Sequence, residues 1–208
     1  MNTITLKQTD ETKFLCSVLA RHPSKFKIDY IAWQDHIFIV EGKACTTDGS
    51  RLHTIPVDLF PPAENHEDRT IYRVIENTRS VLILEPEEDD EVETPPLEAV
   101  TSHPYYDSFV IPYDPLDRKT DKYDPISIRE FALDAILGVR LGVLVQHHFL
   151  AWAAKAKDNI LVSFSDKTSP IKIECARQTA YVMPMANPPD WFERALHTHD
   201  TTEDTSQG

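Results

Sequence analysis

The dipeptide Asp48-Gly49 is the strongest local constraint on how this chain folds. Asp-Gly is typical of two-residue hairpin loops, because such loops need positive φ angles and glycine reaches them without steric penalty. The segments on either side of it, residues 37–45 and 51–57, are the strands that it would join. The pattern predicts two antiparallel strands joined at Asp48-Gly49.

The elements expected around this hairpin are a strand, a helix and then three strands. Residues 3–8 alternate weakly, and Thr9 or Asp10 can cap a helix that runs to about residue 22. The apolar residues of that helix recur at helical spacing and predict its buried stripe: Phe14, Leu15, Val18 and Leu19. Alternation over residues 26–57 then predicts three strands, with turns at 34–35 and 48–49.

The C-terminal part of the chain repeats this order. Helical periodicity predicts helices over residues 127–138 and 146–157, with a short strand at 142–145 between them. Three strands are expected after them, over residues 159–165, 171–176 and 179–185. The sequence therefore predicts an α+β protein made of two βαβββ halves, 1–57 and 126–186.

Residues 58–125 form an insertion between the two halves. A hairpin is expected at 70–84, around Asn77-Thr78-Arg79, and the seven acids within 85–93 indicate a solvated linker. We predict one domain over 1–186 and a C-terminal tail over 187–208 that is mostly disordered after 197. The alternative is a shortened two-domain chain whose second domain begins at Ile126.

Composition narrows the classes of function. The formal net charge is −13, from 34 acidic and 21 basic residues, which argues against broad, charge-driven binding of nucleic acid. The three cysteines are far apart and form no CxxC pair, so the spacing predicts neither a disulfide framework nor a zinc ribbon. The N-terminus lacks a basic, apolar signal segment and no apolar run reaches membrane-spanning length, which favours a cytoplasmic protein.

Three fragments, in this order along the chain, resemble the bacterial sliding clamp, the beta subunit of the replicative DNA polymerase. The segment Cys45-Thr-Thr-Asp-Gly-Ser-Arg-Leu resembles the "ATDGHRL" strand end of that family. Tyr105-Tyr-Asp-Ser-Phe-Val-Ile-Pro112 is similar to "FPDYxRVLP", and Ala180-Tyr-Val-Met-Pro-Met185 is similar to "AYVVMPM". The resemblance implies a DNA-clamp fold, with the helices on one face of the domain and antiparallel sheets on the other. A clamp subunit carries three such domains, and this chain has room for fewer.

The resemblance also implies two kinds of site. The groove that binds partner peptides in clamps would comprise Thr47, Gly49, Ser50, Arg51, Leu52, Tyr181, Val182, Met183, Pro184 and Met185. His53 stands where the family usually has a small residue, so we expect it to narrow this groove. Helix faces line the channel of a clamp, and the basic residues expected to face DNA are Lys13, Arg21, Lys25, His147, His148, Lys155 and Lys157. Ordinary solvated helix faces are the alternative reading of this second set.

The sequence contains no recognisable catalytic motif. GxSxG, P-loop, HExxH and GxGxxG patterns are absent, and we predict a protein that is not an enzyme and holds no cofactor or metal. The expected function is that of a clamp-like platform in DNA replication or repair, a homo-oligomer that contacts double-stranded DNA weakly and binds clamp-binding peptides. A clamp-fold regulator or decoy that never encircles DNA is the alternative. A metal enzyme built on His197 and His199 of the tail is a distant third.

Overall fold

The computed structural model describes residues 3–19, 33–60, 70–87, 92, 95–113, 133, 137, 152–153 and 157–184. The chain divides into two compact units. Unit 1 comprises Met1–Pro104 and Lys172–Val182, and unit 2 comprises Tyr105–Ile171 and Met183–Gly208. No helix within the described ranges is long and apolar enough to cross a membrane.

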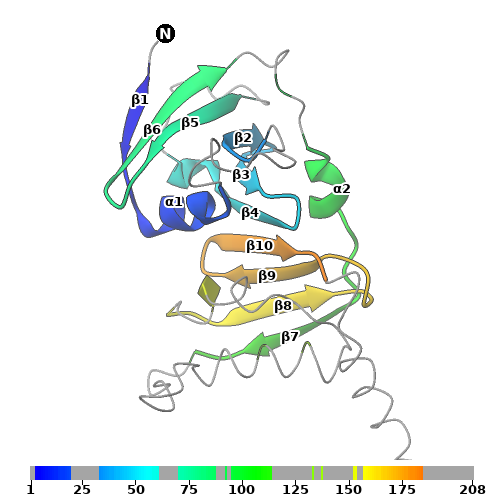
Figure 1. Cartoon of the computed structure of the whole chain (residues 1–208). Coiled ribbons are helices and arrows are strands. Elements are labelled where there is room, and N and C mark those ends of the chain that lie inside the picture. Colours follow the sequence, from blue (N-terminus) through cyan, green and yellow to red (C-terminus); the bar gives the residue numbers. More distant parts are fainter. Residues whose placement is uncertain are drawn as a thin grey trace, which may run out of the picture. The chain divides into compact units, whose positions relative to one another are not determined.

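Unit 1 is built on an antiparallel sheet (Figure 1). The strands run in the order β1-β6-β5-β2-β3-β4-β10-β9, so that neighbours in space are often far apart in sequence. Their bounds are β1 Ile4–Lys7, β2 His36–Val40, β3 Lys43–Thr47, β4 Arg51–Pro56, β5 Ile71–Asn77, β6 Val81–Glu87, β9 Ile171–Cys175 and β10 Gln178–Val182.

The first helix begins where the sequence predicts it. Thr9 caps α1 (Asp10–Leu15): its side chain accepts a hydrogen bond from the N–H of Thr12, and the four residues of the predicted apolar stripe are buried. The α-helix is shorter than predicted, because Cys16–Val18 tightens into a 3-10 turn. There the Ser17 hydroxyl donates to the Phe14 carbonyl at 2.7 Å, a local bond that competes with α-helical continuation.

Two turns differ from the sequence prediction. Residues 37–45 are not one strand, because Glu41 and Gly42 have φ angles of 50° and 71° and join β2 to β3 in a two-residue loop. The next loop lies one residue later than expected. The Asp48 N–H donates to the Arg51 carbonyl at 3.3 Å, which leaves Gly49 (φ 87°) and Ser50 as the loop.

The predicted hairpin of the insertion is confirmed as β5 and β6. Its second strand runs to Glu87, so the first three residues of the predicted acidic linker belong to the sheet. These three residues stay paired because the neighbouring strand β5 begins at Ile71, which lies opposite Glu87. A short helix that was not predicted, α2 (Leu97–Thr101), follows with its Leu97 side chain buried.

The described part of unit 2 centres on an antiparallel pair, β7 (Asp107–Ile111) and β8 (Ile160–Phe164). Strands predicted at 159–165 and 171–176 are confirmed as β8 and β9, whereas β10 ends at Val182 and not at residue 185. The predicted strands at 26–32 and 142–145, the helix at 127–138, nearly all of the helix at 146–157, and the tail lie outside the described residues, apart from isolated positions.

The described chain is mostly antiparallel sheet with few helices. The described residues within 4–56 follow the order strand, helix, three strands, but β2, β3 and β4 stand in place of the two strands predicted at 37–45 and 51–57, and the strand predicted at 26–32 lies outside the described residues. Of the second half, only the last three strands are described. The pair of βαβββ halves and the boundaries drawn for them stay predictions.

Candidate partner-binding surface

The pairing of β4 with β10 brings the first and last clamp-like segments together in one sheet. Arg51 lies opposite Val182, and Leu52 lies opposite Tyr181. On the other side of β4, Leu52 lies opposite Thr47 of β3. Five of the residues predicted from the resemblance therefore occupy one corner of unit 1, where β4 begins and β10 ends (Figure 1).

The turn beside this corner is held by a closed set of polar contacts. The Asp48 carboxylate accepts from the N–H groups of Ser50 and Arg51, each at 3.0 Å, and pairs with the Arg51 Nε at 2.9 Å. The Thr47 hydroxyl donates to the Arg51 carbonyl at 2.8 Å and accepts from the Gly49 N–H at 3.1 Å. These bonds fix the backbone of the turn, while Gly49 and Ser50 themselves remain exposed.

The two faces of β4 have different roles. Successive side chains of a strand point to opposite faces, so Leu52 lies on one face and His53 on the other. α1 covers the His53 face: the Thr46 hydroxyl donates to the Leu15 carbonyl at 2.5 Å, and the His53 ring stacks on Phe14 at 4.2 Å. The expectation that His53 narrows the groove is therefore wrong.

Exposure separates the members of the predicted groove. The side chains of Leu52, Tyr181 and Val182 are buried, so they support the corner and present little surface. Met183, the next residue after β10, is 39% exposed. Pro184 is half-buried, and Met185 lies outside the described residues. The groove as a whole stays a prediction.

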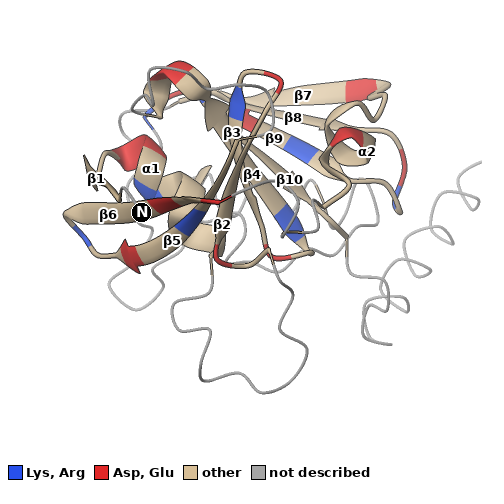
Figure 2. Cartoon of the chain, turned by 90° about the horizontal axis from the view of Figure 1, so that it is seen from above, with Lys and Arg blue, Asp and Glu red and all other residues tan. Residues whose placement is uncertain are grey.

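The residues predicted to face DNA are mostly outside the described ranges. Of that set, the structure describes Lys13 and Lys157, which are both exposed. The Lys13 Nζ lies 3.5 Å from the Asp10 carboxylate on the same helix, beside Glu11. Figure 2 accordingly shows both acidic and basic positions on α1. Arg21, Lys25, His147, His148 and Lys155 lie outside the described residues, and the DNA-facing assignment stays a prediction.

Two kinds of candidate site, metal clusters and reactive cysteines, can be checked among the described residues. No cluster of three or more His, Cys, Asp or Glu side chains within them has the arrangement of a metal site. Burial raises the pKa of the Cys16 and Cys45 thiols to about 12, so both stay protonated near neutral pH. His197 and His199 lie outside the described residues.

Sequence reasoning missed a buried ionic cluster in unit 1. The His36 ring lies between two carboxylates: its Nδ1 is 2.7 Å from Asp35, and its Nε2 is 2.8 Å from Glu87. Arg73 approaches Asp35 at 3.7 Å. Burial lowers the pKa of His36, but the two carboxylates outweigh it and hold that pKa above its usual value. The adjacent residues Asp35 and His36 were the only local sign of this cluster in the sequence, because Glu87 comes close to them only through strand pairing.

Comparison with known proteins identifies the fold. No protein-family model matches the chain, and no curated protein is similar to it in sequence. Solved structures of bacterial beta sliding clamps match over about 88% of the chain. A candidate DNA polymerase III beta subunit from Eubacterium rectale gives a TM-score of 0.50 at 12% identity, covering 89% of this chain and 65% of that protein.

Two further structures match over similar lengths. The Helicobacter pylori beta clamp in complex with 3,4-difluorobenzamide gives a TM-score of 0.47 at 12% identity, covering 86% of this chain and 63% of the clamp. A DNA polymerase sliding clamp from Pseudomonas aeruginosa gives 0.47 at 13%, covering 89% and 67%. The chain thus spans about two thirds of the length of a clamp subunit. The likeness to the Eubacterium rectale structure shows a clamp-like fold.

Proposed function

We propose that this protein is a non-enzymatic, clamp-like platform that binds peptide segments of replication or repair proteins. One observation carries the proposal: strands β4 and β10 place the clamp-like turn segment and the clamp-like C-terminal segment side by side. Neither segment alone would be specific, since Asp-Gly turns are common. Their adjacency in one sheet is what a shared binding surface requires.

The chemistry at this corner suits an apolar peptide. The turn is fixed by its own hydrogen bonds, so it offers a rigid border. Met183 supplies an exposed and flexible thioether that can adapt to ligands of different shape. A Helicobacter pylori clamp has been solved bound to a DNA ligase peptide, and that peptide provides a probe.

A clamp-like platform would also associate with double-stranded DNA and form a homo-oligomer. The sheet leaves the outer side of β1 unpaired among the described strands, and unpaired edges favour strand addition by another copy. The net charge of −13 and the acidic first turn of α1 favour the alternative, a regulator that binds clamp partners without encircling DNA. Both candidates share the peptide surface and differ in their behaviour toward DNA.

The first experiment tests the peptide surface. Fluorescence polarisation with the labelled DNA ligase peptide should show saturable binding to the full chain. Met183→Lys should weaken binding at least about tenfold, which corresponds to about 1.4 kcal/mol, because it places a charge where an apolar contact is expected. The control is Ile75→Lys on β5, which alters another exposed apolar side chain (51% exposed) away from this corner.

The results separate three outcomes. Loss of binding in Met183→Lys, with Ile75→Lys unchanged and both variants melting near the wild-type temperature, supports the assignment. Equal binding by both variants refutes it. If Met183→Lys instead unfolds the protein, Met183 is a structural residue and the groove assignment fails.

The second experiment distinguishes the platform from the decoy. Sedimentation with closed, primed circular DNA should show retention that is lost when the circle is cut, if the protein encircles the duplex. Light scattering gives the oligomeric state under the same conditions. A monomer that binds the peptide but is never retained on closed circles would establish the decoy.

A further inference from the structure

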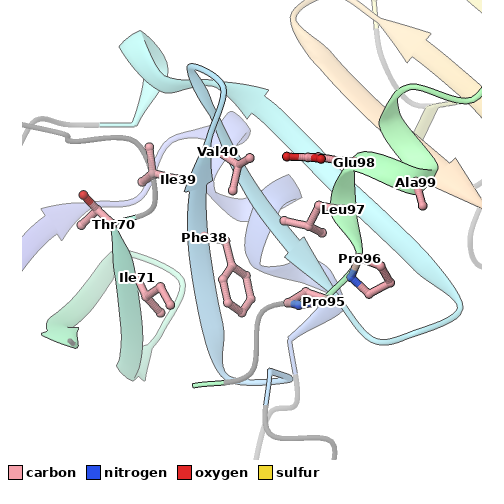
Figure 3. Close-up of a pocket in the computed structure, with 10 residues that line it drawn as sticks. All are labelled: Phe38, Ile39, Val40, Thr70, Ile71, Pro95, Pro96, Leu97, Glu98 and Ala99. Atoms are coloured by element: carbon pink, nitrogen blue, oxygen red, sulfur yellow. The ribbon is translucent and has the colours of Figure 1, made fainter. Parts of the chain in front are cut away.

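An apolar pocket lies in unit 1 between α2 and the strands β2 and β5 (Figure 3). Its volume is about 560 Å³, within the range of pockets that hold small molecules and short peptide segments. The lining residues are Phe38, Ile39, Val40, Thr70, Ile71, Pro95, Pro96, Leu97, Glu98 and Ala99. None of them belongs to the clamp-like segments described above.

The pocket has a buried floor and an open rim. Phe38, Ile71 and Leu97 are buried, whereas Pro96 and Ala99 are exposed and Val40 is half-buried. Such an arrangement leaves apolar surface available at the mouth without exposing the core. A ligand that covers the rim would therefore gain hydrophobic contact without unfolding any element.

The local sequence fixes the wall that α2 provides. Pro95 and Pro96 restrict the backbone before the helix, and the Leu97 N–H donates to the Pro95 carbonyl at 2.7 Å. The helix ends with the Ser102 N–H donating to the Glu98 carbonyl at 2.9 Å. Figure 3 shows Leu97 and Glu98 on α2, directed toward the side where Phe38 and Val40 of β2 lie.

Charge among the described residues at the rim is one-sided. Of the described residues that line the pocket, Glu98 alone is charged, and its side chain is exposed. Exposed Glu41 follows Val40 directly in the chain. Lys43, opposite Val40 in the hairpin, lines a different and smaller hollow together with Arg177 and Glu174. A cation next to an apolar group matches this rim, and an anion does not.

We propose that this pocket is a docking site for a short apolar peptide segment flanked by a basic residue. The apolar side chains would contact Phe38, Val40 and Leu97, and the basic group would pair with the Glu98 carboxylate. The site is independent of the Arg51–Met183 corner and does not rest on the function proposed for that corner. It would let the protein hold a second partner segment.

Two tetrapeptides test the proposal on the full chain. One is acetylated lysine-leucine-phenylalanine-leucine amide, and the other replaces the lysine with glutamate. In ¹H–¹⁵N NMR titrations, the lysine peptide should shift the amides of Ile39, Val40, Thr70 and Leu97, with an affinity about fivefold higher than that of the glutamate peptide. The expected preference is only this large because the Glu98 carboxylate is exposed to solvent, which weakens an ion pair.

A charge reversal identifies the residue responsible. Glu98→Lys should invert the preference, so that the glutamate peptide binds more tightly. Glu76→Lys makes the same change at an exposed position of β5 outside the pocket and should leave the preference as it is in wild type. Met183→Lys should also leave both affinities unchanged, which separates this site from the corner.

Three results would overturn the proposal. The first is that neither peptide shifts the pocket amides at millimolar concentration. The second is that the shifts map instead to Arg51 and Leu52. The third is that Glu98→Lys and Glu76→Lys affect the preference equally. The second result would assign the peptide to the corner alone. Because Glu98 is exposed, its variant should fold, and the melting temperature checks this.

Discussion

The burial of His53 makes a specific prediction about acid stability. Burial lowers the pKa of His53 from 6.5 to about 4, since the ring lies between β4 and α1 with no room for water around a charge. Its Nδ1–H donates to the Phe14 carbonyl at 2.9 Å, so the neutral ring is already satisfied on that side. Folding therefore selects the neutral imidazole.

The sign and size of the effect follow from these two pKa values. Below pH 6.5 the unfolded chain binds a proton at His53 that the folded chain does not, so stability falls as the pH falls. The contribution is fully present above pH 6.5 and is lost progressively toward pH 4. For pKa values of 6.5 and about 4, the loss between pH 7 and pH 5 is about 2 kcal/mol.

Urea unfolding at a series of pH values measures this loss. His53→Phe keeps an aromatic ring against Phe14 and cannot titrate, and the Phe14 carbonyl still accepts the Ser17 hydroxyl at 2.7 Å. The other titrating groups are common to both proteins, so the difference between the two curves isolates His53. The difference should change by about 2 kcal/mol between pH 7 and pH 5. Parallel curves over this range would refute the assignment of a buried, neutral His53.

Two further predictions concern other residues of unit 1. The pH dependence of stability due to His36 has the opposite sign: its raised pKa adds stability that is present below pH 6.5 and is lost as the pH rises through the folded-state pKa. Glu87→Gln should lower that pKa in an NMR titration. An unchanged pKa would show that Asp35 alone keeps it raised. Glu41→Asn should raise the free energy of unfolding by about 0.5–1 kcal/mol, because asparagine tolerates the positive φ of the Glu41-Gly42 loop better than glutamate does. Equal or lower stability in urea unfolding would contradict the second prediction.

Features that depend on neighbouring residues in the chain were predictable from the sequence. The Thr9 cap and the buried stripe of the first helix follow from capping and periodicity, which act within one or two turns. The β5–β6 hairpin was likewise predicted from two alternating runs around a polar loop. The errors in these regions concern where elements end: the α-helix predicted to run to about residue 22 ends at Leu15, and the second strand of the hairpin runs to Glu87 instead of residue 84. The Glu41-Gly42 turn was missed because glutamate seldom adopts a positive φ. In addition, these two residues did not interrupt the apolar pattern from which the strand was predicted.

Apart from the meeting of the two clamp-like segments, which the resemblance implied, features that depend on distant pairing were not predictable. β2 pairs with β5 although β3 and β4 lie between them in the chain, and β6 then pairs with β1 at the edge of the sheet. This strand order places Glu87 next to His36, and it places Phe38 and Ile71 together on the floor of the pocket beside α2. Hydrophobic alternation indicates which face of a strand is buried, but it does not say which strand lies beside it.

The pairing of β4 with β10 has a consequence for whether peptide binding and the encircling of DNA both depend on oligomer formation. Thr47, Arg51, Leu52, Tyr181 and Val182 of this corner belong to unit 1 of one chain, and Met183 follows Val182 directly, so the proposed surface needs no second copy. Encircling DNA, in contrast, requires edges of separate copies to join and close. Peptide affinity should therefore be independent of protein concentration, even if retention on circular DNA is not. A peptide affinity that strengthened in step with oligomer formation would mean that the binding surface is assembled between copies, and the corner alone would not explain it.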